Sequence, residues 1–269
     1  MVDDTAARRE RGRQIYQDVM TVAPPQDDSP TAGAGLLDFV FAEIWSRPGL
    51  SRRCRRFITL PCVAAADAEQ AIEEHVYAAL NSGDLSIVEM RETVLHFAVY
   101  SGWPKASRFN GIVDQQWERI CKERGQPVPP PEPLLPLTTA SDPELRLKGG
   151  EKSFRDINCI PFAPPRDNPY SGAGILNFVF GEMWLRPGLG MKERRLITVA
   201  CVSFQDAPIP IQSHVYAALK SGDITFEEMD EIALHFAAHF GWPKGSYLNQ
   251  VIGEQKVRVL EEATDASAC

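Results

Sequence analysis

Two histidines stand in identical sequence contexts at distant positions of the chain. His75 opens the segment HVYAAL, and His214 opens the same six residues 139 positions later. Histidine is the side chain best suited to gain and lose a proton near neutral pH, so this pair is a candidate for general acid–base chemistry. Tyr77 and Tyr216 follow two residues on and could donate a proton or orient a carbonyl. A purely structural role on a helix stays open for both histidines.

A corner containing tryptophan and arginine also occurs twice. The sequence W-x-R-P-G-L contains Arg47 in the first copy and Arg186 in the second. The planar guanidinium group suits a carboxylate ligand, so these arginines are candidates for substrate binding. The alternative is an ion pair with Glu43 or Glu182, four residues upstream, that holds the corner in place. Both interpretations stay open.

A second pair of arginines precedes an apolar segment in each copy. Arg56 and Arg195 end the RR dipeptides before ITL and ITV, and they are further candidates for binding a carboxylate. His96 and His235 fall within the apolar context LHFA, where a hydrogen-bonded core histidine is the better interpretation.

These residues belong to a unit that is present twice. Residues 35–104 and 174–243 align without a gap and agree at about half of their positions, far above what shared composition would produce. A length of 269 residues independently suggests two domains. We therefore predict a first domain over 1–125 and a second over 144–269. The proline-rich segment 126–143 should join them as an extended linker.

Helical periodicity runs through each copy, and no segment of useful length alternates with a period of two. In the first copy we expect helices over about 36–44, 51–67, 71–81, 86–100 and 105–122. The β-branched residues of the second of these leave a strand possible, although its helical neighbours favour a helix. Proline and glycine predict an irregular loop over 23–35. The fold class is all-α.

The start of the fourth helix carries a recognisable signal in both copies. Ser86 with Glu89, and Thr225 with Glu228, form the S/T-x-x-E capping box. The same helix ends at a glycine that is followed by Trp103 in one copy and by a second tryptophan in the other, Trp242. We expect these tryptophans to act mainly as packing anchors, and we keep them among the candidate substrate-binding residues.

Composition excludes several classes of function. A net charge of −8 and a pI near 5.2 argue against a nucleic-acid surface and a polybasic membrane anchor. No apolar run approaches the ~18 residues that span a bilayer, and the charged start of the chain lacks an apolar signal segment, so we expect a cytoplasmic location.

Six cysteines form neither a CxxC pair nor a metal-ligand spacing. Cys62 and Cys201 repeat in apolar contexts and are expected to be buried thiols, with a redox role as the weaker alternative.

The repeated blocks together resemble a known family. AEIWSRPGL, RRFITL, HVYAAL and AVYSGWP, with GEMWLRPGL, RRLITV, HVYAAL and AAHFGWP, are similar to the corresponding blocks of the carboxymuconolactone decarboxylase family. They keep the family's order and cover most of the chain. The resemblance implies two tandem copies of an alkylhydroperoxidase D-like helical domain and no metal or organic cofactor. It also implies a homo-oligomer, either a trimer of two-domain chains or a dimer.

One branch of this family is poorly matched. The alkylhydroperoxidase branch uses a CxxC pair followed four residues later by a histidine. In this sequence the two cysteine positions hold Ala68 and Ala71 in the first copy, and Ala207 and Pro210 in the second. Without the thiols no dithiol–disulfide cycle is possible, so peroxidase activity is not expected.

The decarboxylase branch is the better match. It acts on a γ-lactone that bears a carboxylate, and loss of CO2 leaves an enolate that must be stabilised and protonated. The resemblance implies that the histidines of HVYAAL supply the proton and that the repeated arginines seat the carboxylate. The expected partner is thus a small carboxylate or lactone, and the reaction a cofactor-free decarboxylation.

This sequence departs from the decarboxylase pattern at two places. The family usually has an arginine where Tyr77 and Tyr216 stand, so we expect the preferred substrate to differ from carboxymuconolactone. The family's Y-C-G before the final proline becomes Y-S-G from Tyr100 and H-F-G from His239. These two residues are candidate substrate contacts, and their difference indicates that the halves are no longer equivalent.

Two hypotheses of different kinds follow. An enzyme should have pockets lined by the HVYAAL histidine, its tyrosine and an arginine. A non-catalytic binding or assembly protein would retain the fold with these groups packed in the core. The presence of all of them in both copies favours the enzyme.

Overall fold

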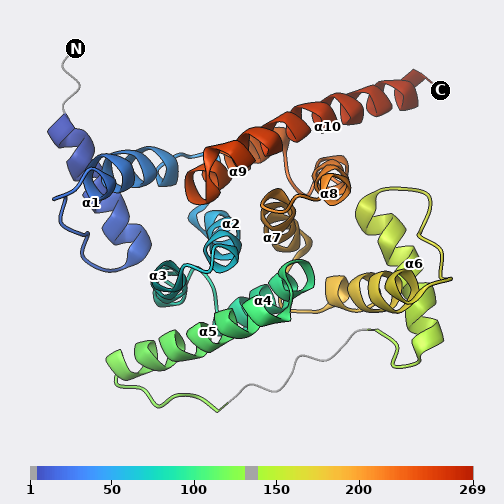
Figure 1. Ribbon diagram of the computed structural model, residues 1–269, viewed down its shortest axis with the longest axis horizontal. Coiled ribbons are helices and arrows are strands. Elements are labelled where there is room, and N and C mark those ends of the chain that lie inside the picture. Colours follow the sequence, from blue (N-terminus) through green and yellow to red (C-terminus); the bar gives the residue numbers. More distant parts are fainter. Residues whose placement is uncertain (1–4, 131–138, 269) are drawn as a thin grey trace.

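The computed structural model describes residues 5–130 and 139–268, and every regular element in these ranges is a helix (Figure 1). The first half contains α1 (Thr5–Met20), η1 (Thr31–Trp45), α2 (Arg52–Ala65), α3 (Glu69–Asn81), α4 (Ile87–Ser101) and α5 (Trp103–Glu123). The second half contains α6 (Pro143–Asn158), η2 (Tyr170–Phe180), η3 (Met183–Leu185), α7 (Met191–Ser203), α8 (Pro208–Lys220), α9 (Phe226–Phe240) and α10 (Trp242–Ala268). The predicted all-α fold class is confirmed.

Local sequence signals explain most helix boundaries. Both capping boxes form, because the side chain of Ser86 or Thr225 accepts from the backbone N–H of the glutamate three residues on. The segment with a possible strand is the helix α2. One boundary was wrong: the loop expected to reach residue 35 ends before Thr31. There the Ser29 hydroxyl accepts from the N–H of Ala32 (3.1 Å) and supports the first turn.

Glycine allows the outer helices of each half to approach closely. α1 packs against η1, and α6 packs against η2. A Cβ atom added to Gly12 would lie 2.1 Å from the carbonyl oxygen of Leu37, and one added to Gly150 would lie 1.7 Å from that of Leu176. No side chain fits at either position. The paired glycines of the sequence therefore set the distance between these helices.

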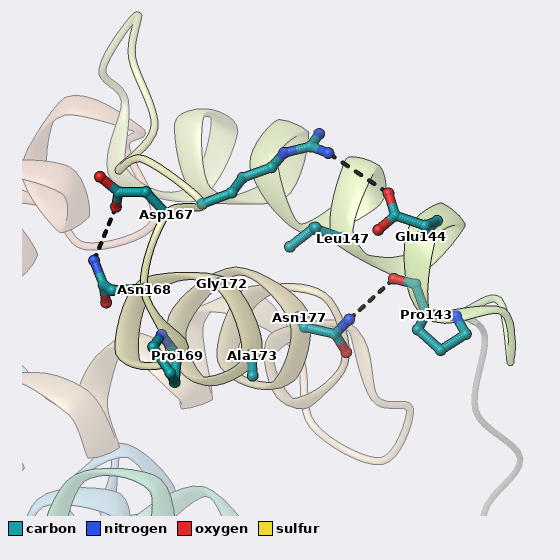
Figure 2. A pocket seen from close by; sticks show the side chains of 10 residues that line it. Pro143, Glu144, Leu147, Asp167, Asn168, Pro169, Gly172, Ala173 and Asn177 are labelled. Carbon is teal, nitrogen blue, oxygen red and sulfur yellow. Dashed lines mark hydrogen bonds and ion pairs between the residues drawn. The ribbon is translucent and has the colours of Figure 1, made fainter.

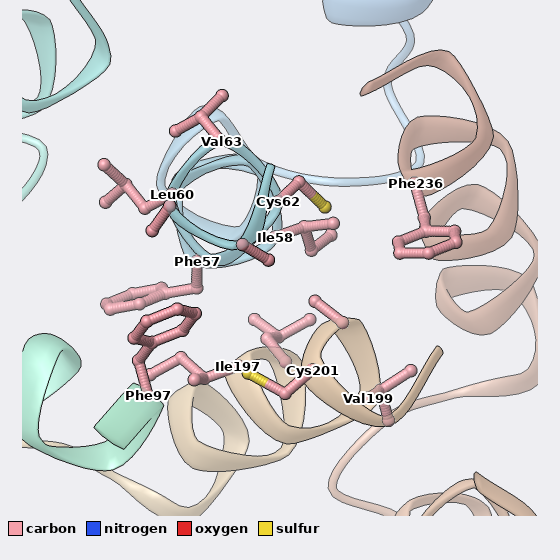
Figure 3. Close-up of a cluster of buried hydrophobic side chains, with 14 of the residues drawn as sticks. Phe57, Ile58, Leu60, Cys62, Val63, Phe97, Ile197, Val199, Cys201 and Phe236 are labelled. Carbon is pink, nitrogen blue, oxygen red and sulfur yellow. The ribbon is translucent and has the colours of Figure 1, made fainter. Parts of the chain in front are cut away.

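The centre of the molecule is shared by the two halves. α2 packs against α7, and their buried side chains form one apolar cluster with residues of α4 and α9 (Figure 3). Cys62 and Cys201 lie in this cluster with no exposed surface. Burial raises the pKa of both thiols well above the ordinary value. The prediction of buried thiols is confirmed.

The long helices cross between the halves. In Figure 1, α4 and α5 run along one side of the central pair and α9 and α10 along the other. α4 contacts α7 and η3, while α9 contacts α2 and η1, so each of these helices packs on elements of the opposite half. This exchange brings residues that are about 190 positions apart in sequence, such as Trp45 and His239, into contact.

The linker is described only in part. Of the predicted linker 126–143, residues 131–138 lie outside the described residues, and Pro143 is already the first residue of α6. Among the helices of the described part, none is both long enough and apolar enough to cross a membrane.

Candidate active site

Each repeated histidine lies beside the corner tryptophan of its own half. The His75 ring stacks on Trp45 with centroids 6.3 Å apart and 12° between the planes. The His214 ring stacks on Trp184 at 6.1 Å and 9°. α3 and α8 carry the histidines, and η1 and η3 carry the tryptophans. We call the surroundings of Trp45 and His75 the first site, and those of Trp184 and His214 the second site.

The opposite half completes each site. Trp45 Nε1 donates to Nε2 of His239 at 3.3 Å, and Trp184 Nε1 donates to the hydroxyl of Tyr100 at 2.9 Å. Thus Tyr100, from the first half, belongs to the second site, and His239 belongs to the first. His239 Nδ1 lies 2.8 Å from the carbonyl oxygen of His235. A proton on Nδ1 satisfies both contacts, so His239 is held as the neutral tautomer.

His96 and His235 are hydrogen-bonded core histidines, as their apolar contexts predicted. His235 Nδ1 lies 3.3 Å from Nη1 of Arg55, and its Nε2 lies 2.7 Å from the hydroxyl of Thr59. Because an arginine can only donate, Nδ1 is the acceptor and Nε2 carries the proton. His96 has the equivalent contacts in the second site, at 3.3 and 2.9 Å. Both side chains are fully enclosed.

Arg56 and Arg195 are buried beside the corner tryptophans. Their Nε atoms donate to Asp84 and Asp223, each at 3.1 Å. Each guanidinium carbon lies 5.3 Å from the centroid of the tryptophan ring of its site. Burial lowers the pKa of Arg56 to about 10. In both arginines Nη1 is buried without a hydrogen-bond partner among the described residues.

The corner arginines form ion pairs across the halves. Arg47 pairs with Glu231 at 2.5 Å, and Arg186 pairs with Glu92 at 2.6 Å. The alternative of a pair with Glu43 or Glu182 was wrong, because α9 and α4 of the opposite half supply the carboxylates that bind Arg47 and Arg186. Glu43 and Glu182 bind other arginines instead. Glu43 pairs with Arg8 at 2.8 Å, and Glu182 pairs with Arg146 at 3.9 Å.

The histidines of both sites are held neutral. Burial lowers the pKa of His214 to about 3, and the positive charge of Arg195 adds to this effect. Burial also lowers the pKa of His75 well below the ordinary value, with smaller contributions from His239 and Arg56. The Nδ1 atoms of both are buried with no partner in the described part of the chain. Each is therefore a neutral imidazole whose buried Nδ1 is unused by the described residues.

The tyrosines of HVYAAL point to the last helix of their own half. Tyr77 donates to Glu123 and Tyr216 donates to Glu262, each at 2.7 Å. An arginine covers each ring, with the guanidinium carbon of Arg258 3.8 Å from the centroid of Tyr216. Burial, assisted by the hydrogen bond to Glu262, raises the pKa of Tyr216 to about 12. These phenols are therefore protonated, and their protons are already bonded.

A cavity of about 780 Å³ opens at the second site. His214 and Tyr216 line it together with Arg258, so a histidine, its tyrosine and an arginine converge there. Its volume falls in the range of ~300–1,000 Å³ that is usual for small-molecule sites. The corresponding region of the first site has a cavity of about 280 Å³, lined by Tyr77 and Arg119 but not by His75.

The tryptophans after the long helices are apart from the sites. Trp103 and Trp242 are each 54 % exposed. Their rings lie 6.3 Å from Phe178 and 6.2 Å from Phe39, which are residues of the opposite half. Trp242 lines a separate hollow of about 250 Å³ on α9 and α10. Both side chains therefore lie half-exposed at the junction of the halves, and the structure does not bring them to the histidines.

Another hollow, of about 420 Å³, lies between α6 and η2 (Figure 2). Its polar groups bind one another: Asn177 donates to the carbonyl of Pro143 at 3.0 Å, and Arg166 pairs with Glu144 at 3.7 Å. It contains no histidine or tyrosine. In the described part of the chain, no group of three or more His, Cys, Asp and Glu side chains is arranged to hold a metal ion.

Sequence reasoning missed the charged residues at the mouth of the second cavity. Lys220 and Arg258 both line it, and both pair with Glu262, at 2.7 and 3.1 Å. The sequence contained part of the information needed to find these residues. Arg119 and Glu123 repeat as Arg258 and Glu262 with the same offset as the histidines.

Comparison with known proteins bears on the identity of these sites. The model of the carboxymuconolactone decarboxylase family matches residues 30–115 and again 169–252. The chain is also 35% identical over 69 residues to 4-carboxymuconolactone decarboxylase of Acinetobacter baylyi, a match that covers 26% of this chain and 51% of that protein. It is 36% identical over 69 residues to nitrosuccinic acid decarboxylase of Metarhizium robertsii, covering 26% and 48%.

These matches have a defined extent. The chain spans about half the length of each of the two decarboxylases. The two family matches contain the corner, the HVYAAL segment and the long helix of each half, and so the tryptophans, histidines and buried arginines of both sites. The cavity residues of α5 and α10, and those that precede residues 30 and 169, lie outside the matches. The chain belongs to the carboxymuconolactone decarboxylase family, of which it contains two tandem copies.

Proposed function

We propose that the protein is a cofactor-free decarboxylase that acts on a small carboxylated lactone or a keto or enol acid. The observation that carries the proposal is His214, a neutral histidine on the wall of a cavity of ligand size, whose buried Nδ1 is unused by the described residues. Arg195, with its own unused donor, acts electrostatically on the same histidine. Both matched relatives are named as decarboxylases, which supports the reaction class.

The chemistry requires a group for the anion and a group for the proton. The bond between the carboxylate carbon and its neighbour breaks, CO2 leaves, and the electron pair moves into the conjugated carbonyl as an enolate. One proton must then be delivered to carbon. Hydrogen-bond donors placed where the negative charge develops lower the barrier, and we assign this role to Arg195 in the second site.

The histidine is assigned to the proton transfer. With a pKa of about 3 in the empty site, His214 carries no proton to give near neutral pH. A carboxylate bound beside it supplies the opposite charge that favours imidazolium, so the substrate itself raises the pKa of the general acid. His214 would take a proton as substrate binds and release it to the enolate carbon. The Tyr100 ring lies 5.5 Å from the His214 ring between centroids, and we assign its hydroxyl to orienting the substrate carbonyl.

The tyrosines two residues after the histidines receive a different role from the one that the sequence suggested. The hydroxyl of Tyr216 is bonded to Glu262, so its proton is not free for the enolate. We assign Tyr216 to the cavity wall, where it holds Arg258 over its ring. The substrate we propose therefore remains distinct from carboxymuconolactone.

CO2 release from a panel of small carboxylates, including 4-carboxymuconolactone and nitrosuccinate, tests the proposal. His75→Asn and His214→Asn each remove one site histidine, and the double variant removes both. We expect turnover of at least one acid by the natural protein and a loss of at least about 100-fold in the double variant. Thermal unfolding checks that the variants remain folded. Unchanged CO2 release in a folded double variant would show that the histidines are not catalytic.

A further inference from the structure

The mouths of the two cavities differ in charge at equivalent positions. In the first half Glu73 and Glu74 line the cavity, together with one cation, Arg119. In the second half Ser213 replaces Glu74, while Lys220 and Arg258 add two cations. Beside the lining residues of the first half, Glu123 and Arg124 add one charge of each sign, and Glu262 adds one negative charge in the second half. The first mouth is thus net negative and the second is net positive.

Apolar residues enlarge the same contrast. Ile209 and Phe162 line the second cavity and are 78 % and 66 % exposed. The residue equivalent to Ile209 is Gln70 in the first half. Phe162 has no equivalent, because the stretch between the end of α6 and the APP sequence is two residues longer than the stretch after α1. The second cavity therefore offers a larger apolar wall than the first, where Met20 and Val22 are the apolar lining residues.

We propose that the chain has one working pocket, in the second half, which selects a small organic anion with an apolar body, and that the first half excludes such anions. The carboxylate is attracted by Lys220 and Arg258, and the body lies against Phe162 and Ile209. The proposal rests on the proposed function only in so far as the bound anion then reacts. Selection of the anion depends on the charges and the volumes alone.

Electrostatics supports the selection. A single carboxylate, that of Glu262, is shared by Lys220 and Arg258, so one positive charge is left uncompensated at the second mouth. Charges of one sign at a cleft with apolar walls raise the local concentration of ligands of the opposite sign. At the first mouth the carboxylates of Glu73 and Glu74 repel an incoming carboxylate, and about 280 Å³ leaves little room for it.

The chain supplies matched variants to test this. Ser213→Glu with Lys220→Asn places the first-half residues at the second mouth, and Glu74→Ser with Asn81→Lys makes the reciprocal change. Isothermal titration calorimetry of the full chain would use 4-phenylbutyrate as the anionic probe and 4-phenylbutanamide as its neutral counterpart. We expect each natural chain to bind one molecule of 4-phenylbutyrate and to bind 4-phenylbutanamide more weakly. In the S213E/K220N variant we expect the affinity for 4-phenylbutyrate to be at least about tenfold lower. The E74S/N81K variant should retain the second-half affinity.

Three results would overturn the proposal: two equivalent 4-phenylbutyrate sites per natural chain, equal affinity for 4-phenylbutanamide and 4-phenylbutyrate, or an unchanged affinity for 4-phenylbutyrate in the S213E/K220N variant. These failures are distinct from failure of the proposed function. One selective site without CO2 release from any acid would refute the reaction and keep the pocket. Undiminished CO2 release by the S213E/K220N variant would refute the single working pocket and keep the reaction.

Discussion

The first and second sites share most of their buried contacts, apart from the exchange of His239 for Tyr100, and differ chiefly where they meet solvent. The stacked tryptophan and histidine, the arginine that binds the core histidine, and the ion pair across the halves are present twice with nearly equal distances. The cavity mouths differ in charge, size and loop length. Buried polar groups must find partners or lose free energy, so this part of the duplicated unit has little freedom to vary. The mouth has no such constraint, and most of the differences between the two copies lie there.

The largest difference in stability should come from the ion pairs across the halves. The side chain of Arg186 is 12 % exposed, whereas that of Arg47 is 46 % exposed. Arg186→Gln would leave Glu92, whose side chain is 8 % exposed, without its ion-pair partner, at a cost of about 3 kcal/mol or more in the free energy of unfolding. Arg47→Gln should cost about 1 kcal/mol less, because Glu231 keeps its 3.3 Å ion pair with Arg55. Urea unfolding of both variants measures the difference, and equal losses would show that the two corners are equivalent.

The next effect is the response to acid. The pKa values of all five histidines are lowered in the folded protein, to about 3 for His214 and about 4 for His239. As pH falls below about 6.5, the unfolded chain takes up protons that the folded chain does not, so the free energy of unfolding decreases. Each such histidine contributes a slope of up to about 1.4 kcal/mol per pH unit.

The sites differ in this response because the first contains His75, His235 and His239, whereas the second has Tyr100 in the position of His239. His239→Tyr should therefore flatten the decrease in stability between pH 6 and pH 4 and bring the first site closer to the second. Thermal unfolding across this pH range, beside the natural protein, gives the slope. A slope unaltered by the substitution would mean that His239 does not resist protonation.

The smallest effect concerns the tryptophan N–H groups. Trp184→Phe leaves the Tyr100 hydroxyl without its donor at 2.9 Å, and Trp45→Phe removes the longer contact, 3.3 Å, to His239. Both variants lose the same ring volume, so the difference between them reports the hydrogen bonds. Trp184→Phe should be the more destabilising by less than about 1 kcal/mol. Chemical unfolding measures this, and the reverse order would indicate that the His239 contact is the stronger one.

Much of the fold could be predicted from the sequence because its signals are local. Helical periodicity, the capping boxes at Ser86 and Thr225, and the breaks at Gly102 and Gly241 depend on residues a few positions apart. The duplication could be predicted equally well, because it is found by aligning the sequence with itself. The apolar contexts of Cys62 and Cys201 correctly indicated buried thiols.

The exchange of helices between the halves could not be predicted in this way. The partners of Arg47 and Trp45 lie 184 and 194 positions away, and no local pattern specifies them. For the same reason the sequence comparison placed Tyr100 and His239 with their own repeats instead of with the opposite sites. The charged mouth of the second cavity was missed because Lys220 and Arg258 come from two helices that only the fold brings together.

The most direct test of the account is a crystal structure of the protein grown with 4-phenylbutyrate. We predict density for the ligand in the cavity lined by His214, with its carboxylate within hydrogen-bonding distance of Lys220 or Arg258. We also predict that the region around His75 holds no ligand. Density beside His75, or equal occupancy of both halves, would contradict the claim that only the second half receives the anion.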